Sequence, residues 1–451
     1  MFPPFRASFL GAGMVIGTNA ITHMVIAQGV AVGLFSTLGL LDWYGLRRGY
    51  GTGDAWDAML KRLLTFSAVV ASVAGAVTGA GIWFTIGSLA PRATASMLRV
   101  FLWPWFIEWL VFVVEAVLLI ALYFAWDWLG RHRLMRSLLF IAYGLSAFFS
   151  AFLITGIIGF MLTVGNWPEH PTLATAFFNP SFAPQLLARL AIAGVAGSVI
   201  GMGVLLLPGH EREPQAAALG PFGAILLVCL LVFAGAVTWY FSVVPDFYTT
   251  RTVFAVLTQH LSSTPLLFYA ANALAALLLL AAALLALARR VRPSRWLVVP
   301  GLIAAIAFIA EMERVREFIR GPYLMPSHMY VSEVLLPERF LNAGRGMLAG
   351  DYWYQRARRT PDLDQTGVEL FNGNCATCHT VGGINNMRTR VAGRSQDGIR
   401  VLLDHTHELV SFMPPFSGSP KEADIMARVL YRLGQGQAQL KSHSRMLAGA
   451  P

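Results

Sequence analysis

Eight long apolar runs dominate this chain of 451 residues and restrict its fold more than any other feature. A helix that crosses a membrane needs about 20 consecutive, mostly apolar residues, and each run supplies at least that many. We therefore predict an all-α, polytopic membrane bundle of about eight spans, followed by a small α-helical domain. The runs fall near residues 9–42, 63–89, 101–128, 134–165, 183–208, 220–243, 264–288 and 296–317.

Composition agrees with a membrane protein. Hydrophobic residues make up 56% of the chain and charged residues only 13%, whereas a soluble domain carries about 25% charged residues. The net charge of +10 would suit a nucleic-acid-binding protein. The arginines, however, lie in short clusters between the apolar runs, as membrane proteins place them. We therefore exclude nucleic acid as a partner and expect a lipid bilayer around the runs.

The loops between the runs differ in positive charge. The loops after runs one, three, five and seven are rich in Lys and Arg, and the alternate loops are poor in them. Because cytoplasmic loops are enriched in basic residues, we predict that both termini lie outside. In a bacterium this places the chain in the inner membrane with its C-terminal segment in the periplasm. The basic loops hold Arg47, Arg48, Lys61, Arg62, Arg131, Arg133, Arg136, Arg212, Arg289, Arg290, Arg292 and Arg295; the others hold Arg92, Arg99 and Arg251.

Domain boundaries follow from changes in composition. The first apolar run continues to about residue 41, which is too long for a cleaved signal sequence, so we interpret it as the first span. From about residue 336 the chain becomes polar and basic. We predict a membrane domain over residues 1–325, a linker over 326–361, a soluble domain over 362–436 and a tail over 437–451.

The soluble segment contains FNGNCATCHT, in which Cys375, Cys378 and His379 form a C-x-x-C-H motif. This spacing is the attachment signature of c-type haem: the thiols bond to the haem vinyl groups, and the histidine is the proximal iron ligand. A low-spin electron carrier needs a second axial ligand, and methionine in that position raises the reduction potential. Met413, in the proline-stiffened SFMPPF loop, is the candidate. The motif predicts one covalent haem c.

A zinc site is the alternative, because structural zinc takes four protein ligands and His405 and His407 could complete the set. The C-x-x-C-H motif, the MPPF loop and the flanking helical segments instead resemble a mono-haem class I cytochrome c over residues 364–434. Covalent haem attachment takes place outside the cytoplasm in bacteria. The distribution of arginines independently predicts that location for this segment.

Ionisable residues inside the apolar runs are functional candidates, since each is costly to place in a membrane. His23 lies in run one and Arg189 in run five. Glu108 and Glu115 lie seven positions apart in run three, on one helix face. Each has a structural alternative: His23 as a hydrogen-bonded packing residue, and the two glutamates as hydrogen-bonding partners between helices. More charges crowd the end of run eight: Glu311, Glu313, Arg314, Arg316 and Glu317.

Four segments resemble subunit I of the cytochrome bd quinol oxidases and occur in that family's order. They are THMVIAQGVAVGLF, GAVTGAGIWFTIG, FIEWLVFVVEAVLLIALYFAWDWLG and REFIRGPY. The likeness spans about residues 10–325. The family buries b-type haems and a d-type haem near the outer surface and reduces O2 to water. The resemblance therefore implies non-covalent haem b, with haem d as a further expectation, and a subunit II-like membrane partner.

The resemblance also implies roles for individual residues. His23 matches the family's haem-ligating histidine of the first helix, and Glu317 matches a glutamate that ligates a high-spin haem, with Arg320 following in register as a cofactor-binding residue. Glu115 matches the acidic residue before the family's W-D-x-L-G turn. Glu108 approximates the preceding acidic residue, at a spacing one residue shorter. Both glutamates are thereby implied to be catalytic.

The chain departs from the family at three points. In run five, QLLARLAIAG places Arg189 where the family has the histidine of its low-spin haem. The loop between runs six and seven, which carries the family's quinol-oxidising segment, has only about twenty residues. A cytochrome c sequence replaces the ninth span. Other candidates for the missing low-spin ligand are Met161, His170, His260 and Met325.

These departures favour electron transfer between an outer c haem and buried haems, with periplasmic electron-transfer proteins as partners. We interpret the chain as a respiratory oxidoreductase, a bd-like terminal reductase of O2 or of a similar small molecule such as nitric oxide. Two alternatives stay open. One is a quinol-to-cytochrome c oxidoreductase, with quinol as its partner. The other is a non-catalytic electron-relay anchor of a larger complex.

Overall fold

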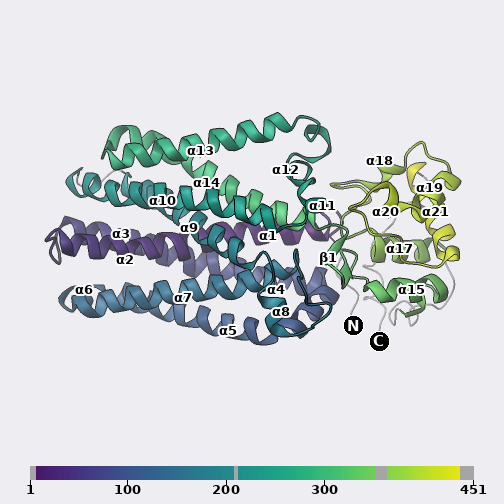
Figure 1. The fold of residues 1–451 in the computed structure, drawn as a ribbon, viewed down its shortest axis with the longest axis horizontal. Helices are drawn as coiled ribbons and strands as arrows, with labels where there is room; N and C mark the ends of the chain where they lie inside the picture. The colour runs from purple at the N-terminus through teal and green to yellow at the C-terminus, as the bar shows by residue number, and fades with distance from the viewer. Residues whose placement is uncertain (1–6, 208–211, 351–362, 437–451) are drawn as a thin grey trace. The chain divides into compact units, whose positions relative to one another are not determined.

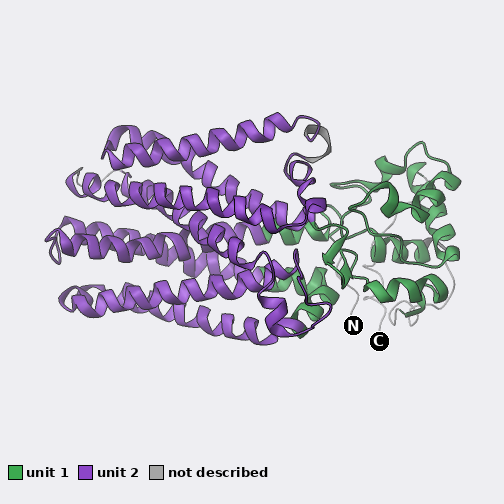
Figure 2. Ribbon diagram, viewed as in Figure 1, with its two compact units in different colours: residues 1–19, 82–99, 320–451 green, residues 20–81, 100–319 purple. Residues whose placement is uncertain are grey.

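A computed structural model describes residues 7–207, 212–350 and 363–436 (Figure 1). The predicted tail and the linker from residue 351 onward lie outside the described residues. The chain divides into two compact units, shown in Figure 2. Unit 2 comprises residues 20–81 and 100–319, and unit 1 comprises residues 1–19, 82–99 and 320–451.

Among the described residues, eight helices are long and apolar enough to span a membrane, which confirms the predicted bundle. Several of these helices begin earlier than the predicted apolar runs, because their first turns contain polar residues that were not counted in the runs. The second span, for example, begins at Ala55 with the N-cap Asp54 accepting a hydrogen bond from the Asp57 amide. The spans are Ala12–Arg47, Ala55–Leu89, Pro91–Phe124, Arg133–Phe160, Phe182–Leu205, Glu213–Val243, Pro265–Leu287 and Val291–Ile319.

Two spans are interrupted by π-helical turns, which occur often at functional sites. The first span consists of α1 (Ala12–Ile26), η1 (Ala27–Leu34) and α2 (Phe35–Arg47), and the second of α3 (Ala55–Val69), η2 (Val70–Gly75) and α4 (Ala76–Leu89). The remaining spans are α5 (Pro91–Phe124), α7 (Arg133–Phe160), α9 (Phe182–Leu205), α10 (Arg212–Val243), α13 (Pro265–Leu287) and α14 (Val291–Ile319). Short helices lie between them: α6 (Trp126–Arg131), α8 (Leu173–Phe177), α11 (Asp246–Thr249) and α12 (Thr252–Leu261).

Small residues let η1 and α9 approach closely inside unit 2. A Cβ placed on Gly33 would lie 2.0 Å from the carbonyl oxygen of Ala193, and one placed on Gly197 would lie 2.3 Å from the carbonyl carbon of Gly33. Only glycine fits at these distances. Membrane helices commonly pack through small residues of this kind. In lipid the hydrophobic effect does not drive helices together, so close backbone contact stabilises the pair instead. Of the eight spans, α9 is the most buried, and it packs against η1, α7, α10 and α14.

An ion-paired cluster joins α2, α3 and α7 at the end of unit 2 where the basic loops lie. Arg136 belongs by sequence to the loop arginines, but its side chain is fully buried. Its guanidinium donates to Asp57 at 2.8 Å and to Asp42, and it lies 4.5 Å from the ring centre of Trp126. A buried charge is tolerated only when it is paired and hydrogen-bonded, so the two aspartates make this burial possible.

In unit 1, ordered structure follows the last span. A two-stranded antiparallel hairpin comes first, then α15 inside the segment interpreted as a linker. Glu338, in the first turn of α15, accepts a hydrogen bond from Arg92 at 2.5 Å, and Glu333 accepts one from the Ala93 amide at 2.9 Å. These contacts fasten the segment to the start of α5. The elements are β1 (Tyr323–Met325), β2 (Met329–Tyr330), α15 (Leu336–Arg345) and η3 (Leu348–Gly350).

The C-terminal part of unit 1 is helical and has its own core, which includes Leu370, Phe371, Ile399, Met426 and Leu430. Ser419 and Glu422 form a capping box at the start of α21. Glu422 also accepts hydrogen bonds from the backbone amides at 347 and 348, at 2.8 and 3.0 Å. One buried carboxylate thus joins the described part of the predicted linker to α21. The helices are α17 (Leu363–Asn374), α18 (Met387–Val391), α19 (Gln396–Asp404), α20 (Thr406–Leu409) and α21 (Pro420–Gly434).

The glycine contact between η1 and α9 gives a stability prediction. In Gly197→Ala the new Cβ meets the backbone of Gly33, and overpacking of this kind costs about 2 to 3 kcal/mol. The matched control is Gly235→Ala on α10, since a Cβ at that position meets no atom within 4 Å. We expect the thermal midpoint of the detergent-solubilised protein to fall for Gly197→Ala and to stay unchanged for the control. Equal midpoints would contradict the close approach of the two helices.

Candidate functional site

The C-x-x-C-H segment follows directly after α17 and forms a tight turn. The Cys375 amide donates to the Phe371 carbonyl, and the His379 amide donates to the Cys375 carbonyl, each at 2.8 Å. Cys375 is half-buried and Cys378 is exposed, and neither forms a disulfide bond. The imidazole of His379 is buried, and its Nδ1 donates to the carbonyl oxygen of Asn385 at 3.3 Å. Such a bond fixes the ring and leaves Nε2 for a metal.

Burial lowers the pKa of His379 to about 4, the Asn385 carbonyl opposes this effect, and nearby Arg390 adds to it. The ring is therefore neutral at neutral pH, which is the form that binds iron. Two thiols beside a neutral, oriented imidazole fit a covalently attached haem. These residues would hold the group, and the iron would supply one-electron chemistry.

Met413 lies in the loop between α20 and α21. Its amide donates to Val410 at 2.8 Å, and its carbonyl oxygen accepts a hydrogen bond from His407 Nδ1 at 3.0 Å. These bonds shape the loop backbone, and the axial role of the sulfur stays a prediction. His405 pairs with Glu408 at 2.7 Å. In the described residues, no group of three or more His, Cys, Asp or Glu is arranged to hold a metal ion.

Positive charge gathers beside the C-x-x-C-H segment. Arg388, Arg390 and Arg394 are exposed, and no acidic residue occurs in the sequence between Glu369 and Asp397. Arg390 donates to the side-chain oxygen of Asn385 at 2.9 Å. Asn385 thus links Arg390 to the buried His379. The surface here would attract a negatively charged partner.

In unit 2, His23 lies near the end of α1, just before η1. Its Nδ1 is 3.0 Å from the hydroxyl oxygen of Thr78 on α4. A Cβ placed on the adjacent Gly79 would lie 3.1 Å from His23 Cε1, so the glycine gives the imidazole room to lie against α4. A ring that is anchored through one nitrogen fits a ligand of non-covalent haem.

Glu108 and Glu115 are half-buried on α5. The hydroxyl group of Ser150, on α7, donates to Glu108 at 3.2 Å. Glu115 Oε1 is buried and has no hydrogen-bond partner in the described part of the chain. Buried polar atoms are almost always paired, so a lone one marks a place where another group or water belongs. The two glutamates of α5 thus differ: Glu108 accepts a hydrogen bond, whereas Glu115 Oε1 accepts none within the described chain.

Arg189 is fully enclosed in unit 2 and forms a buried ion pair with Glu313 on α14. Glu313 also pairs with Arg316 at 3.3 Å, and Arg316 pairs with Glu317 at 2.6 Å. The result is a chain of alternating charges with no net charge. A guanidinium has no acceptor atom and does not deprotonate in proteins, so Arg189 is not a haem ligand.

The predicted ligand Glu317 keeps a partly exposed side chain beside Arg316. Arg320 is buried in unit 1 and donates to the carbonyl oxygen of Leu324 at 2.8 Å. Of the other low-spin candidates, Met161 is half-buried at the end of α7, His170 is exposed in a loop, and Met325 is buried in β1. The side chain of His260 lies outside the described residues.

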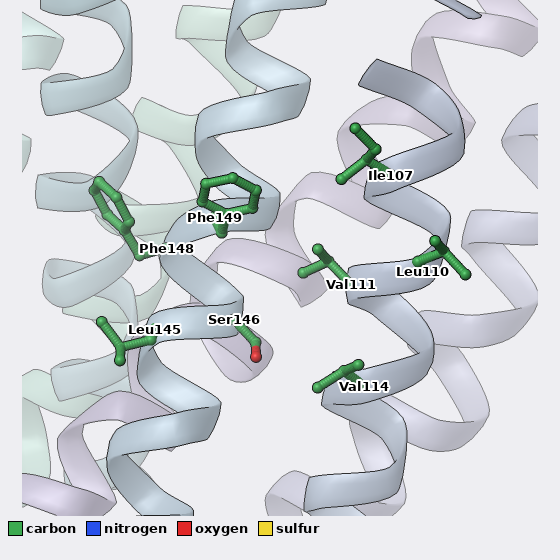
Figure 3. Close-up of a pocket in the computed structure, with 8 residues that line it drawn as sticks. All are labelled: Ile107, Leu110, Val111, Val114, Leu145, Ser146, Phe148 and Phe149. Carbon is green, nitrogen blue, oxygen red and sulfur yellow. The ribbon is translucent and has the colours of Figure 1, made fainter. Parts of the chain in front are cut away.

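A groove of about 490 Å³ lies between α5 and α7. Figure 3 shows side chains from the two helices lining it. None of the lining residues is ionisable, so the groove itself provides no catalytic group. It is lined by Ile107, Leu110, Val111, Val114, Leu145, Ser146, Phe148 and Phe149.

Sequence reasoning missed two parts of this arrangement. It did not connect Asp42, Asp57 and Arg136, because they belong to three different helices. The signal available was the placement of both aspartates within or next to an apolar run. It also missed Asn385, the acceptor for His379, since asparagines in loops are common and this one carries no distinctive pattern.

Comparison with known proteins supports both parts of the chain. Residues 362–431 match the family described as cytochrome c oxidase, cbb3-type, subunit III. No curated protein sequence matches the chain. Its fold is similar to that in "The structure of bd oxidase from Geobacillus thermodenitrificans", with a TM-score of 0.56 and 15% identity over 70% of this chain and 89% of that chain. A bd-oxidase-like membrane bundle is fused here to a C-terminal cytochrome c domain. The chain is thus a multi-pass haem protein of electron transport.

The predicted ligands of haem c can be tested separately from the bundle. His379→Ala should remove the c-type absorption band, because the proximal ligand is lost. Met413→Leu should keep the covalent haem and lower its reduction potential, since methionine ligation raises it. The control is His405→Ala, whose exposed ring pairs with the exposed Glu408. Pyridine haemochrome spectra and redox titration provide the measurements. An unchanged potential in Met413→Leu would exclude the axial role.

The buried ion pair of Arg189 and Glu313 predicts that removing one partner destabilises the protein more than replacing both. In Arg189→Met the carboxylate of Glu313 keeps only the longer contact to Arg316, and breaking a buried pair costs about 3 kcal/mol. Adding Glu313→Gln should recover part of this loss, because no buried carboxylate then lacks its closest partner. Lys61→Met breaks an exposed pair with Asp127, and such pairs contribute about 0 to 1 kcal/mol. Thermal midpoints of these variants would be compared. A loss no larger than that of Lys61→Met would contradict the buried pairing.

Proposed function

We propose that this chain is a terminal reductase of O2, or of a similarly small molecule such as nitric oxide, supplied with electrons through its own haem c. The observation that carries the proposal is the ion pair of Arg189 and Glu313. By resemblance it stands where the bd oxidases hold the low-spin haem that receives electrons from quinol. A chain that lacks this ligand needs another electron input, and a fused cytochrome c domain supplies one.

The connection between α10 and α13 supports the same direction of flow. In the family this connection carries the quinol-oxidising segment. Here the residues between Val243 and Pro265 contain two short helices, α11 and α12. The segment is short and folded, so it leaves little chain for a quinol site.

His23 is the proposed ligand of the haem that meets the gas. Haem bound there would supply an open iron position at which a small molecule binds. The chain's own contribution is orientation, since Thr78 fixes one ring nitrogen. Glu317 is proposed as a second haem ligand and Arg320 as a cofactor contact, both by resemblance alone.

Reduction of O2 to water consumes a proton with each electron, so protons must reach the site. Glu108 and Glu115 are proposed to carry them along α5. Their spacing puts both carboxyl groups on one helix face. Glu115 Oε1 has no bonded partner in the described chain, so it is available to a proton donor or to water.

The arginines at 388, 390 and 394 fit the docking of an acidic electron-transfer protein beside haem c. Covalent haem attachment and the uneven distribution of basic loop residues both support a periplasmic cytochrome c domain. A subunit II-like membrane partner is proposed on the resemblance to bd oxidases.

The proposal predicts a CO-reactive membrane haem that depends on His23. In membranes or purified protein, the reduced spectrum should change on addition of carbon monoxide, and His23→Ala should abolish this change. The haem c band should stay intact in the variant. His132→Ala is the control, since that exposed ring bonds the carbonyl oxygen of Trp128 within its own short segment. Oxygen consumption with chemically reduced haem c should fall in parallel with the CO signal.

Low-spin b and c bands without any response to CO would contradict the proposal. They would favour the quinol-to-cytochrome c oxidoreductase or the relay anchor instead. A CO response that survives His23→Ala would retain the activity and exclude the assigned ligand.

A further inference from the structure

Within unit 1, the haem-attachment segment and the loop after it contact the first residues of α1 and the residues just before it through two backbone hydrogen bonds. The amide of Gly13 donates to the carbonyl oxygen of Thr377 at 3.0 Å. The amide of Ile384 donates to the carbonyl oxygen of Phe9 at 2.8 Å. Thr377 lies between the two cysteines of the C-x-x-C-H motif. The contact therefore involves the haem-attachment residues themselves.

The first bond satisfies a donor that the helix cannot satisfy. Gly13 is the second residue of α1, and the first amides of a helix have no acceptor within it. Near a lipid phase such a donor is costly to leave unpaired. The cytochrome segment thus provides part of the N-terminal cap of the first span.

The second contact requires glycine. A Cβ placed on Gly383 would lie 2.0 Å from the carbonyl oxygen of Phe9. At the neighbouring Gly382 a Cβ would meet nothing within 4 Å. Two further hydrogen bonds fix the conformation of the loop that contains Gly383. The Thr380 hydroxyl accepts from the Gly383 amide at 2.9 Å and donates to the Ile384 carbonyl oxygen at 2.8 Å.

We propose that these contacts form an internal docking interface that holds the cytochrome c domain on the first span, with Gly383 as the residue that permits the approach. The electron-transfer consequence rests on the proposed function. The c domain then acts as a fixed electron donor to the membrane haems and not as a mobile carrier.

The test uses the full haem-loaded protein and compares Gly383→Ala with Gly382→Ala. Hydrogen exchange of the peptides that contain Gly13 and Ile384 reports the interface directly. Because the new Cβ would displace the Phe9 carbonyl oxygen and open the interface, we expect about tenfold faster exchange in Gly383→Ala. Rapid reduction of haem c should show electron transfer to the membrane haems slowed by about tenfold as well. Gly382→Ala should match the wild type, and both variants should contain the same amount of covalent haem.

A second variant covers the case in which Gly383→Ala loses haem c. Gly13→Pro removes the amide that donates to the Thr377 carbonyl oxygen, in the first helical turn where proline is tolerated. Wild-type exchange in haem-loaded Gly383→Ala and Gly13→Pro would overturn the docking interface. Lost protection in the variants, combined with no electron transfer to membrane haems in the wild type, would support the interface and contradict the proposed function.

Discussion

A membrane interior offers no water to a polar group, and this constraint shapes most of the structure. Charged side chains inside the spans must find their partners within the protein. In unit 2 the charges at Arg189, Glu313, Arg316 and Glu317 alternate in sign along one path. The same solution recurs where Arg136 meets two aspartates. Both clusters join helices that are distant in sequence, so the need to pair charges also selects which helices become neighbours.

The same constraint applies to backbone groups at the ends of spans. At the start of α1, the Thr377 carbonyl oxygen accepts a hydrogen bond from the Gly13 amide. At the start of α5, the Glu333 carboxylate accepts one from the Ala93 amide. Both acceptors come from the chain after the last span. The C-terminal part of the protein thus supplies hydrogen-bond acceptors to helices that lie more than two hundred residues earlier. This accounts for a compact unit that contains residues 1–19 and 82–99 together with the cytochrome c domain.

The features that the sequence predicts correctly are local. Apolar length locates the eight spans, and the spacing of Cys375, Cys378 and His379 identifies the cytochrome c domain. The features that it does not predict depend on long-range pairing. The basic neighbours of Arg136 indicate a loop cation, and only its aspartate partners explain its burial. The polar sequence of α15 indicates a linker. Its ion pair with Arg92 joins residues that lie 246 positions apart in the sequence, so the sequence pattern does not predict it. The requirement for glycine at 383 is likewise visible only once Phe9 is placed beside it.

The two kinds of carboxylate in unit 2 suit two different tasks. Glu313 lies between two arginines, so protonating it would leave buried positive charge without a counter-ion, at a high cost in free energy. Glu115 has no counter-ion in the described chain, so a change in its protonation breaks no ion pair. A fixed charge network suits a rigid interior. An unpaired carboxyl group suits a path along which protons move. The division agrees with the proposed function, in which electrons arrive from the fused cytochrome and protons from α5.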